Sequence, residues 1–233
     1  MAERIRLDDP DVEVALRRSA RARRLTLTVP GGGEPPRVTA PKGVPLSEIR
    51  MFLYRQADWL QTALERAPDV VAVRTGASIP VAGRTVRIIH QPGRRRPPSL
   101  SGDALVIEGG SGDDAAKRIA VWLRERARAA VTPIAEDCAE ALGGRLGRIS
   151  LRDPKSRWGS CNARGDLSFS WRLAMAPPAV LDYVAAHEAA HLIEMNHSSR
   201  FWALVERLRP DWREQRDWLK REGAALHRYR FDS

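Results

Sequence analysis

The residues best suited to chemistry lie in one short run of the chain, from His187 to His197. The run opens with His187, Glu188 and His191 in the order His-Glu-x-x-His. Residues i and i+4 share one face of an α-helix, so the imidazoles of His187 and His191 can point at a common metal ion. Glu188 lies about 100° around the helix from His187, where it can accept a proton from a water molecule on that metal.

A third ligand is needed, because a catalytic zinc site uses three protein ligands and keeps one position open. His197 is the candidate. To return to the metal, the chain must leave the helix after Met195, and Asn196 tolerates the left-handed conformation found at helix ends. Three imidazoles favour zinc over manganese or cobalt in a cell. The run therefore predicts a Zn²⁺ hydrolase with Glu188 as its general base, and the alternative is an amphipathic helix with ordinary histidines.

The elements around this run are those of an enzyme core. Pro177-Pro178 is typical of a helix start, and we expect that helix to carry the first five residues of the run. A longer helix is predicted from Asp113 or Asp114 to Leu142, where Gly143-Gly144 ends it. Between the two helices, short strands are expected at 149–151 and 167–169.

The first half of the chain has a β-rich pattern. Alternating residues predict strands at 24–29 and 37–40, joined as a hairpin, and further strands at 85–90 and 104–108. One helix is expected after Pro45, ending near Pro68. Because the Gly-rich segment 109–112 reads as a boundary, we predict a β-rich N-terminal region at 1–110 and a hydrolase domain at 111–233. The fold class is α+β.

Three segments together resemble the YgjP-like metallopeptidase family, which is related to the WLM and SprT-type proteins. They are Lys155 to Cys161, Trp171 to Pro177, and His187 to His197 with the following Ser198 and Phe201-Trp202. The resemblance is densest from Lys155 to Trp218. It implies a zincin-like half in which the motif helix packs on a small sheet, and it assigns the metal to His187, His191 and His197, with Glu188 catalytic.

The sequence departs from the expected pattern at a few positions. Ala189 stands where this family usually has Leu, and Ser170 where it often has Asn. Glu194 occupies the position of a metzincin glycine, which argues against a metzincin proper. The changes at Ala189 and Ser170 remove no proposed ligand, so we expect them to affect packing more than chemistry, and Glu194 is left either as a group that supports a metal ligand or as a surface residue.

Residues near the motif are candidates for substrate binding, namely Lys155, Arg157, Trp158 and Arg172. An edge strand beside the metal can pair with an extended peptide by strand addition. For the cations a surface salt bridge is the alternative, and for Trp158 it is core packing. Cys161 could instead approach the metal as a fourth ligand, which would make the zinc structural.

The composition, with 43% hydrophobic and 29% charged residues, is ordinary for a soluble globular protein, and the length predicts a folded unit of the size of an enzyme. The N-terminal residues lack the apolar core of a signal peptide, and no apolar run is long enough to span a membrane. With only two cysteines, we expect a cytoplasmic protein.

The formal charge of +10 is compatible with nucleic acid or nucleotides as partners, although the arginines are scattered and no base-reading module is present. The main prediction is a peptide or protein substrate. The alternatives are a metal-dependent nucleotide phosphohydrolase, a DNA-associated SprT-like protease, and a nucleic-acid-binding protein with structural zinc.

Overall fold

The computed structural model describes residues 3–30, 33–65 and 69–231, and the chain divides into two compact units, Met1–Val70 and Val71–Ser233. The boundary expected at residue 110 therefore falls inside the second unit. The 109–112 segment connects a strand to a helix within that unit. Glycine-rich composition alone does not distinguish such a turn from a linker between units.

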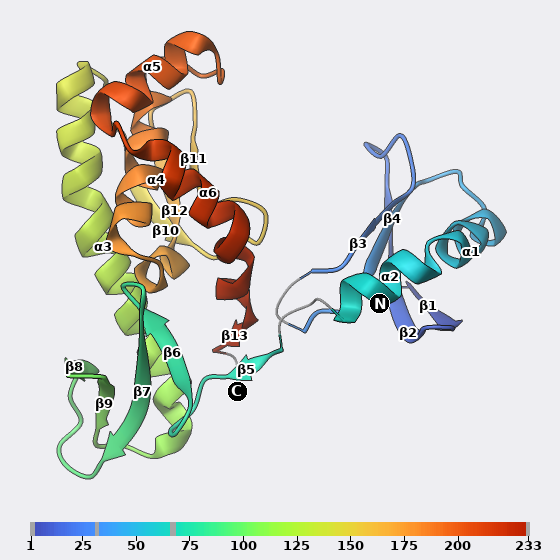
Figure 1. Ribbon diagram of the computed structural model, residues 1–233, viewed down its shortest axis with the longest axis horizontal. Coiled ribbons are helices and arrows are strands. Elements are labelled where there is room, and N and C mark those ends of the chain that lie inside the picture. Colours follow the sequence, from blue (N-terminus) through green and yellow to red (C-terminus); the bar gives the residue numbers. More distant parts are fainter. Residues whose placement is uncertain (1–2, 31–32, 66–68, 232–233) are drawn as a thin grey trace. The chain divides into compact units, whose positions relative to one another are not determined.

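The first unit is a four-stranded sheet with two helices (Figure 1). Its strands run in the order β1-β2-β4-β3, with β2 and β4 parallel and the other pairs antiparallel. The predicted hairpin is the antiparallel pair β3 and β4. The elements are β1 (Glu3–Asp8), β2 (Asp11–Ser19), β3 (Thr26–Thr28), β4 (Arg37–Pro41), α1 (Leu46–Arg55) and α2 (Ala57–Glu65).

The prediction of one helix in this region is wrong, because the helix is interrupted at Gln56. There the backbone N–H of Gln56 donates to both Phe52 and Leu53, which tightens the last turn of α1. Both resulting helices still bury their apolar faces, through Ile49, Leu53 and Leu60, in the core of this unit. Hydrophobic spacing therefore locates the buried positions but not the break.

The second unit has mixed α and β structure. A four-stranded sheet of order β6-β7-β9-β8 packs through buried apolar side chains on the long helix α3. A three-stranded sheet of order β10-β12-β11 lies beside α4, and a two-stranded pair joins β5 to β13. Together with the first unit this confirms the predicted α+β class, with the motif helix α4 against a small sheet.

The elements of the second unit are β5 (Val71–Ala72), β6 (Ser78–Val81), β7 (Arg84–Gln91), β8 (Ser99–Ser101), β9 (Ala104–Glu108), η1 (Gly112–Asp114), α3 (Ala115–Leu142), β10 (Ile149–Arg152), β11 (Gly159–Cys161), β12 (Leu167–Ser170), η2 (Trp171–Met175), α4 (Pro178–Ala190), α5 (Ser199–Leu208), α6 (Trp212–Glu222), η3 (Gly223–Arg228) and β13 (Tyr229–Arg230).

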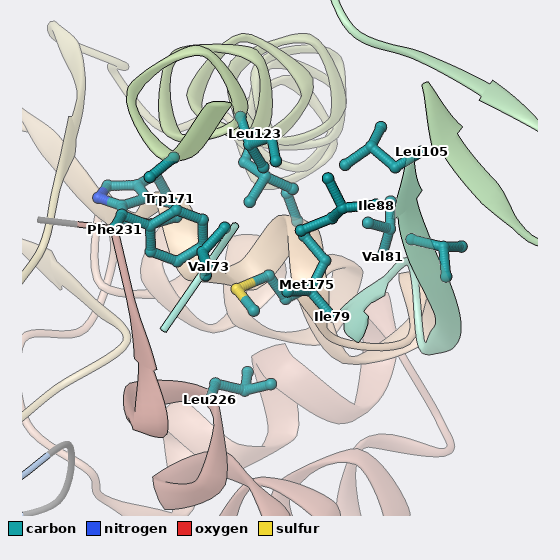
Figure 2. Close-up of a cluster of buried hydrophobic side chains, with 14 of the residues drawn as sticks. Val73, Ile79, Val81, Ile88, Leu105, Leu123, Trp171, Met175, Leu226 and Phe231 are labelled. Carbon is teal, nitrogen blue, oxygen red and sulfur yellow. The ribbon is translucent and has the colours of Figure 1, made fainter. Parts of the chain in front are cut away.

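A buried apolar cluster joins the sheet of β6 to β9 to the segment that precedes α4. Figure 2 shows Ile79 and Ile88 from the sheet, Leu123 from α3, and Trp171 and Met175 from η2 within it. Burial of a side chain of this size stabilises the fold by about 1.5 to 3 kcal/mol. The cluster therefore fixes η2, the segment from which α4 begins.

The tip of the β6–β7 hairpin sets the position of the α4 N-terminus. Ala82 and Gly83 turn with positive φ angles of 49° and 77°, and their N–H groups donate to the carbonyls of Ala174 and Met175. A Cβ on Gly83 would lie 3.1 Å from the Cα of Pro177. Glycine at 83 thus allows both the turn and the close approach to the residue that caps α4.

Candidate metal centre

Helix α4 carries the first two histidines of the motif and is buried on almost every side. It packs against α3, α5, α6 and β11, and Ala185, Ala186 and Ala189 have no exposed surface. His187 lies within the helix, and His191 is its C-cap residue with right-handed helical angles. The predicted helix therefore carries the first four residues of the run, and the fifth, His191, follows directly as its cap.

The chain then turns and brings His197 back beside them. Ring nitrogens of His187, His191 and His197 lie within 4.8 Å of one another, and the two Nε2 atoms of His187 and His197 are 3.1 Å apart. The prediction of a left-handed conformation at Asn196 is wrong. Ala82 is the only described non-glycine residue with a positive φ, so Asn196 has a negative one. The reversal uses successive hydrogen-bonded turns instead, among them the Glu194 N–H donating to Ala190.

The start of α5 fixes His197. Ser198 caps this helix, its Oγ accepting a hydrogen bond from the N–H of Phe201 at 3.3 Å. The fully buried Phe201 ring then contacts all three imidazoles, with centroid separations of 4.9 Å to His187, 4.4 Å to His191 and 4.7 Å to His197. The Phe201 ring is thus an apolar surface against which the three imidazoles pack.

Neighbouring groups orient two of the imidazoles. Nδ1 of His191 lies 3.0 Å from the carbonyl of Glu194, to which it can donate as an N–H, leaving Nε2 as the free ligand atom. The hydroxyl of Tyr183 lies 3.4 Å from Nδ1 of His187. Burial and the neighbouring histidines lower the pKa of His187 to about 3, so its imidazole is neutral at physiological pH.

The donor set fits a zinc ion. Tetrahedral zinc with nitrogen ligands at about 2.0 to 2.1 Å requires those nitrogens to lie roughly 3.3 Å apart. The separation of 3.1 Å between Nε2 of His187 and Nε2 of His197 is close to this value. The imidazoles of His187 and His191 also have a partner at Nδ1, as metal-ligating histidines usually do.

Glu188 lies beside the three histidines and is only 6% exposed. Burial raises the pKa of its carboxyl to about 8, while the positive charge of Arg157 acts in the opposite direction. The backbone of β11 lies directly against it, since a Cβ on Gly159 would be 2.5 Å from both Cγ and Oε1 of Glu188. The carboxyl group is therefore held between the motif helix and the edge of the small sheet.

These groups open into one cavity of about 400 Å³, which we call the motif cavity. Its walls are the histidine run on one side and β11 with the preceding residues on the other. It is lined by Arg157, Trp158, Gly159, Ser160, Cys161, Tyr183, Val184, His187, Glu188, His191, Met195, His197 and Leu219.

The four candidate substrate residues are placed differently. Arg157 and Trp158 line the motif cavity, whereas Lys155 and Arg172 do not. Trp158 also packs in the core, with its ring 5.3 Å from that of His227. Arg157 is exposed and forms no ion pair with the described residues.

Arg172 is 7% exposed and ties distant parts of the chain together. Its guanidinium pairs with Asp153 at 2.7 Å and donates to the carbonyls of Leu226 and Tyr229 at 2.8 and 3.0 Å. These contacts explain the burial and the position of Arg172 without a role in substrate binding.

Sequence reasoning missed two contributors to the site. Tyr183 stands four residues before His187 on α4, so the helical period alone could have placed its hydroxyl near that imidazole. Gly159 is a different case, because its contact with Glu188 joins segments far apart in the sequence. No local pattern reports such a contact.

A helix-borne His-Glu-x-x-His pair with a third histidine, opening on a cavity beside a sheet edge, is the architecture of a metal-dependent hydrolase. The family comparison agrees, since residues 23–222 match the model described as YgjP-like, metallopeptidase domain. The chain belongs to this YgjP-like family.

One solved structure is similar over part of the chain, the crystal structure of the metallopeptidase zymogen of Pyrococcus abyssi abylysin. The two share 25% sequence identity over 40% of this chain and 95% of that one, with a TM-score of 0.36. No curated protein matches significantly. In the part of the chain that the structure describes, no helix combines the length and the apolar character needed to cross a membrane.

Proposed function

We propose that this protein is a zinc-dependent metallopeptidase that hydrolyses internal peptide bonds, with His187, His191 and His197 as metal ligands. The observation that carries the proposal is the convergence of the three imidazoles on one point within the motif cavity, beside Glu188. The family supports peptides as substrates. The choice of zinc is supported by the all-imidazole donor set.

A zinc ion held in this way supplies a Lewis acid that lowers the pKa of a water molecule towards about 7. Glu188 would accept the proton of the attacking water and deliver it to the leaving amine. It must be ionised to do so, and both Arg157 and a nearby divalent cation favour the carboxylate over the neutral acid that burial favours. Its confinement against Gly159 keeps the carboxyl in place.

Strand β11 offers a surface on which a peptide can be aligned. It is the edge strand of its sheet, paired with β12 on one side only. Its three residues line the motif cavity, so a peptide added to its open side would pass the proposed metal. Trp158 and Arg157 flank this path at the entrance to the strand.

The test is a comparison of wild type with Glu188→Gln on internally quenched peptides blocked at both ends. Glutamine keeps the shape of the side chain but cannot accept the proton, so turnover should fall at least about 100-fold. The variant should hold as much zinc as wild type. An active Glu188→Gln protein would remove Glu188 from this role.

A nucleotide phosphohydrolase is the second candidate. It is favoured by one observation, that the exposed Arg157 lines the cavity beside the three histidines, since cations stabilise phosphoryl charge. Nucleoside triphosphates assayed beside the peptides would separate the two. Hydrolysis of the triphosphates alone would reject the peptidase.

A further inference from the structure

The outer face of the β10-β12-β11 sheet carries a row of three serines. The strand register places Ser150 opposite Ser168, and Ser168 opposite Ser160, so one serine from each strand lies in line across the sheet. Side chains of residues aligned in this way point to the same face. Three hydroxyl groups thus cross the sheet side by side.

Arginines flank this row. Arg148 and Arg152 lie two residues before and after Ser150, and the period of a strand puts them on the same face. Arg157 and Arg164 lie just before and just after β11. All four arginines are exposed.

Most of this charge is uncompensated. Arg164 pairs with Asp166 at 3.2 Å, whereas Arg148, Arg152 and Arg157 form no ion pair with any described residue. Asp166 is the only acidic residue that the structure places in the wall of this face. Arg148 and Arg152 are thus unpaired, and Arg157 acts electrostatically on the buried Glu188, so positive charge prevails on this concave surface and attracts an anionic ligand.

The face is concave, with a volume of about 700 Å³, and we call it the arginine cavity. It shares Arg157, Gly159 and Ser160 with the motif cavity, so the two meet along the edge strand. A ligand bound at one can extend into the other without leaving the surface.

We infer that the arginine cavity binds acidic side chains of the peptide substrate on one side of the bond to be cleaved. This inference rests on the proposed peptidase function. A peptide paired with the open side of β11 lies one strand spacing beyond it, so it must leave that strand and cross the serine face to reach β10, three spacings or roughly 14 Å away. An extended chain covers this distance in about four to five residues, so glutamate or aspartate at about that separation from the cleaved bond would reach Arg148 and Arg152.

The spread of the arginines favours separate carboxylates over one compact phosphate. Arg148 and Arg152 stand four residues apart on one edge of the sheet, and Arg157 belongs to the other edge. A single phosphate group cannot contact them all. Successive acidic side chains of one peptide can pair with them individually, and the hydroxyls of Ser160 and Ser168 can donate to the same carboxylates, while that of Ser150 donates to the carbonyl of Leu167.

The test measures binding without cleavage. Zinc-loaded Glu188→Gln protein is titrated into fluorescein-labelled peptides of equal length, one with three glutamates on a single side of its centre and one with glutamines there. The acidic peptide should bind at least about tenfold more tightly. Adding Arg148→Gln and Arg152→Gln should abolish this preference, whereas adding Arg84→Gln and Arg87→Gln, exposed residues of β7, should preserve it.

Equal affinity for the two peptides would overturn the inference, as would the same loss in the β7 control. Tighter binding of a mixed-sequence oligonucleotide, lost in the same double variant, would reassign the face to nucleic acid and also overturn it. Cleavage by wild type is scored separately. Selective binding of the acidic peptide with no cleavage would reject the peptidase function and keep the arginine cavity as a site for acidic side chains. Cleavage with no preference for the acidic peptide would support the peptidase function and overturn the inference.

Discussion

The backbone of Gly159 lies directly against the side chain of Glu188. A Cβ at position 159 would be 2.5 Å from Cγ and Oε1 of that glutamate, a distance that real Cβ atoms do not reach. The edge strand and the motif helix can approach this closely only because residue 159 has no side chain. The smallest residue on β11 thus sets the position of the proposed general base.

Gly159→Ala should therefore damage catalysis more than metal binding. The added methyl must displace Glu188, and overpacking of this kind costs about 1 to 3 kcal/mol of stability. We expect peptide turnover to fall at least about tenfold, since small displacements of a catalytic group are costly. Zinc content should be unchanged, as measured by mass spectrometry.

The matched control is Gly112→Ala, because a Cβ there would meet its nearest neighbour at an ordinary 3.5 Å. Full activity of Gly159→Ala, or an equal loss in the control, would show that the contact with Glu188 has no catalytic consequence.

Tyr183→Phe should weaken metal binding while leaving the fold intact. The hydroxyl lies 3.4 Å from Nδ1 of His187, where it can fix the orientation of that ring. Loss of such an outer partner typically lowers metal affinity about 10- to 100-fold. Competition with a chelating dye would measure the change, and an unaltered zinc affinity would show that Phe201 and the other rings suffice to orient His187.

Cys161 should behave as a neutral thiol and not as a zinc ligand. Burial raises its pKa to about 11, with contributions from the nearby carboxylates Glu188 and Asp166. The thiolate is the reactive form, so alkylation of the folded, metal-free protein should be slow below pH 9 and accelerate towards pH 11. The unfolded chain, with its ordinary pKa, should react fully at lower pH.

Zinc content of Cys161→Ser completes this test. The variant should retain one zinc per chain. Loss of the metal would instead support a closed, structural site with Cys161 as fourth ligand.

Arg172→Gln should destabilise the protein and leave the chemistry of the folded molecules unchanged. The change removes the pair with Asp153 and two hydrogen bonds to carbonyls of the C-terminal segment. Hydrogen bonds of charged groups contribute about 1.5 to 3 kcal/mol each, and the pair with the 37% exposed Asp153 adds little, so we expect a loss of at least about 3 kcal/mol.

Urea unfolding would measure this loss beside Arg213→Gln, whose exposed pair with Glu206 should contribute less than about 1 kcal/mol. If the Arg172→Gln variant has normal stability but a raised KM for peptides, Arg172 has a role in substrate binding instead.

The sequence predicts the parts of the site that depend on local periodicity. The helical placement of His187 and His191 follows from their spacing, and the return of His197 follows from the need for a third ligand. The turn itself was predicted wrongly at Asn196, because several hydrogen-bonded turns can reverse a chain as well as one left-handed residue.

Features that depend on distant segments were not predictable in this way. The serine row exists only through the register of β10, β12 and β11, and Gly159 contacts Glu188 only through the packing of sheet on helix. The sequence makes Arg172 a candidate for substrate binding, whereas its burial and its pair with Asp153 give it a structural role. Local charge does not report which arginine is buried.

The central claim is a metal held by the three histidines, and the most direct measurement is metal content by plasma mass spectrometry. Wild type and Glu188→Gln should each carry about one zinc per chain, and His191→Ala should carry almost none because two ligands rarely hold zinc tightly. Circular dichroism would check that the variant is folded. Absence of metal from wild type even after zinc is supplied, or full zinc in a folded His191→Ala protein, would contradict the account.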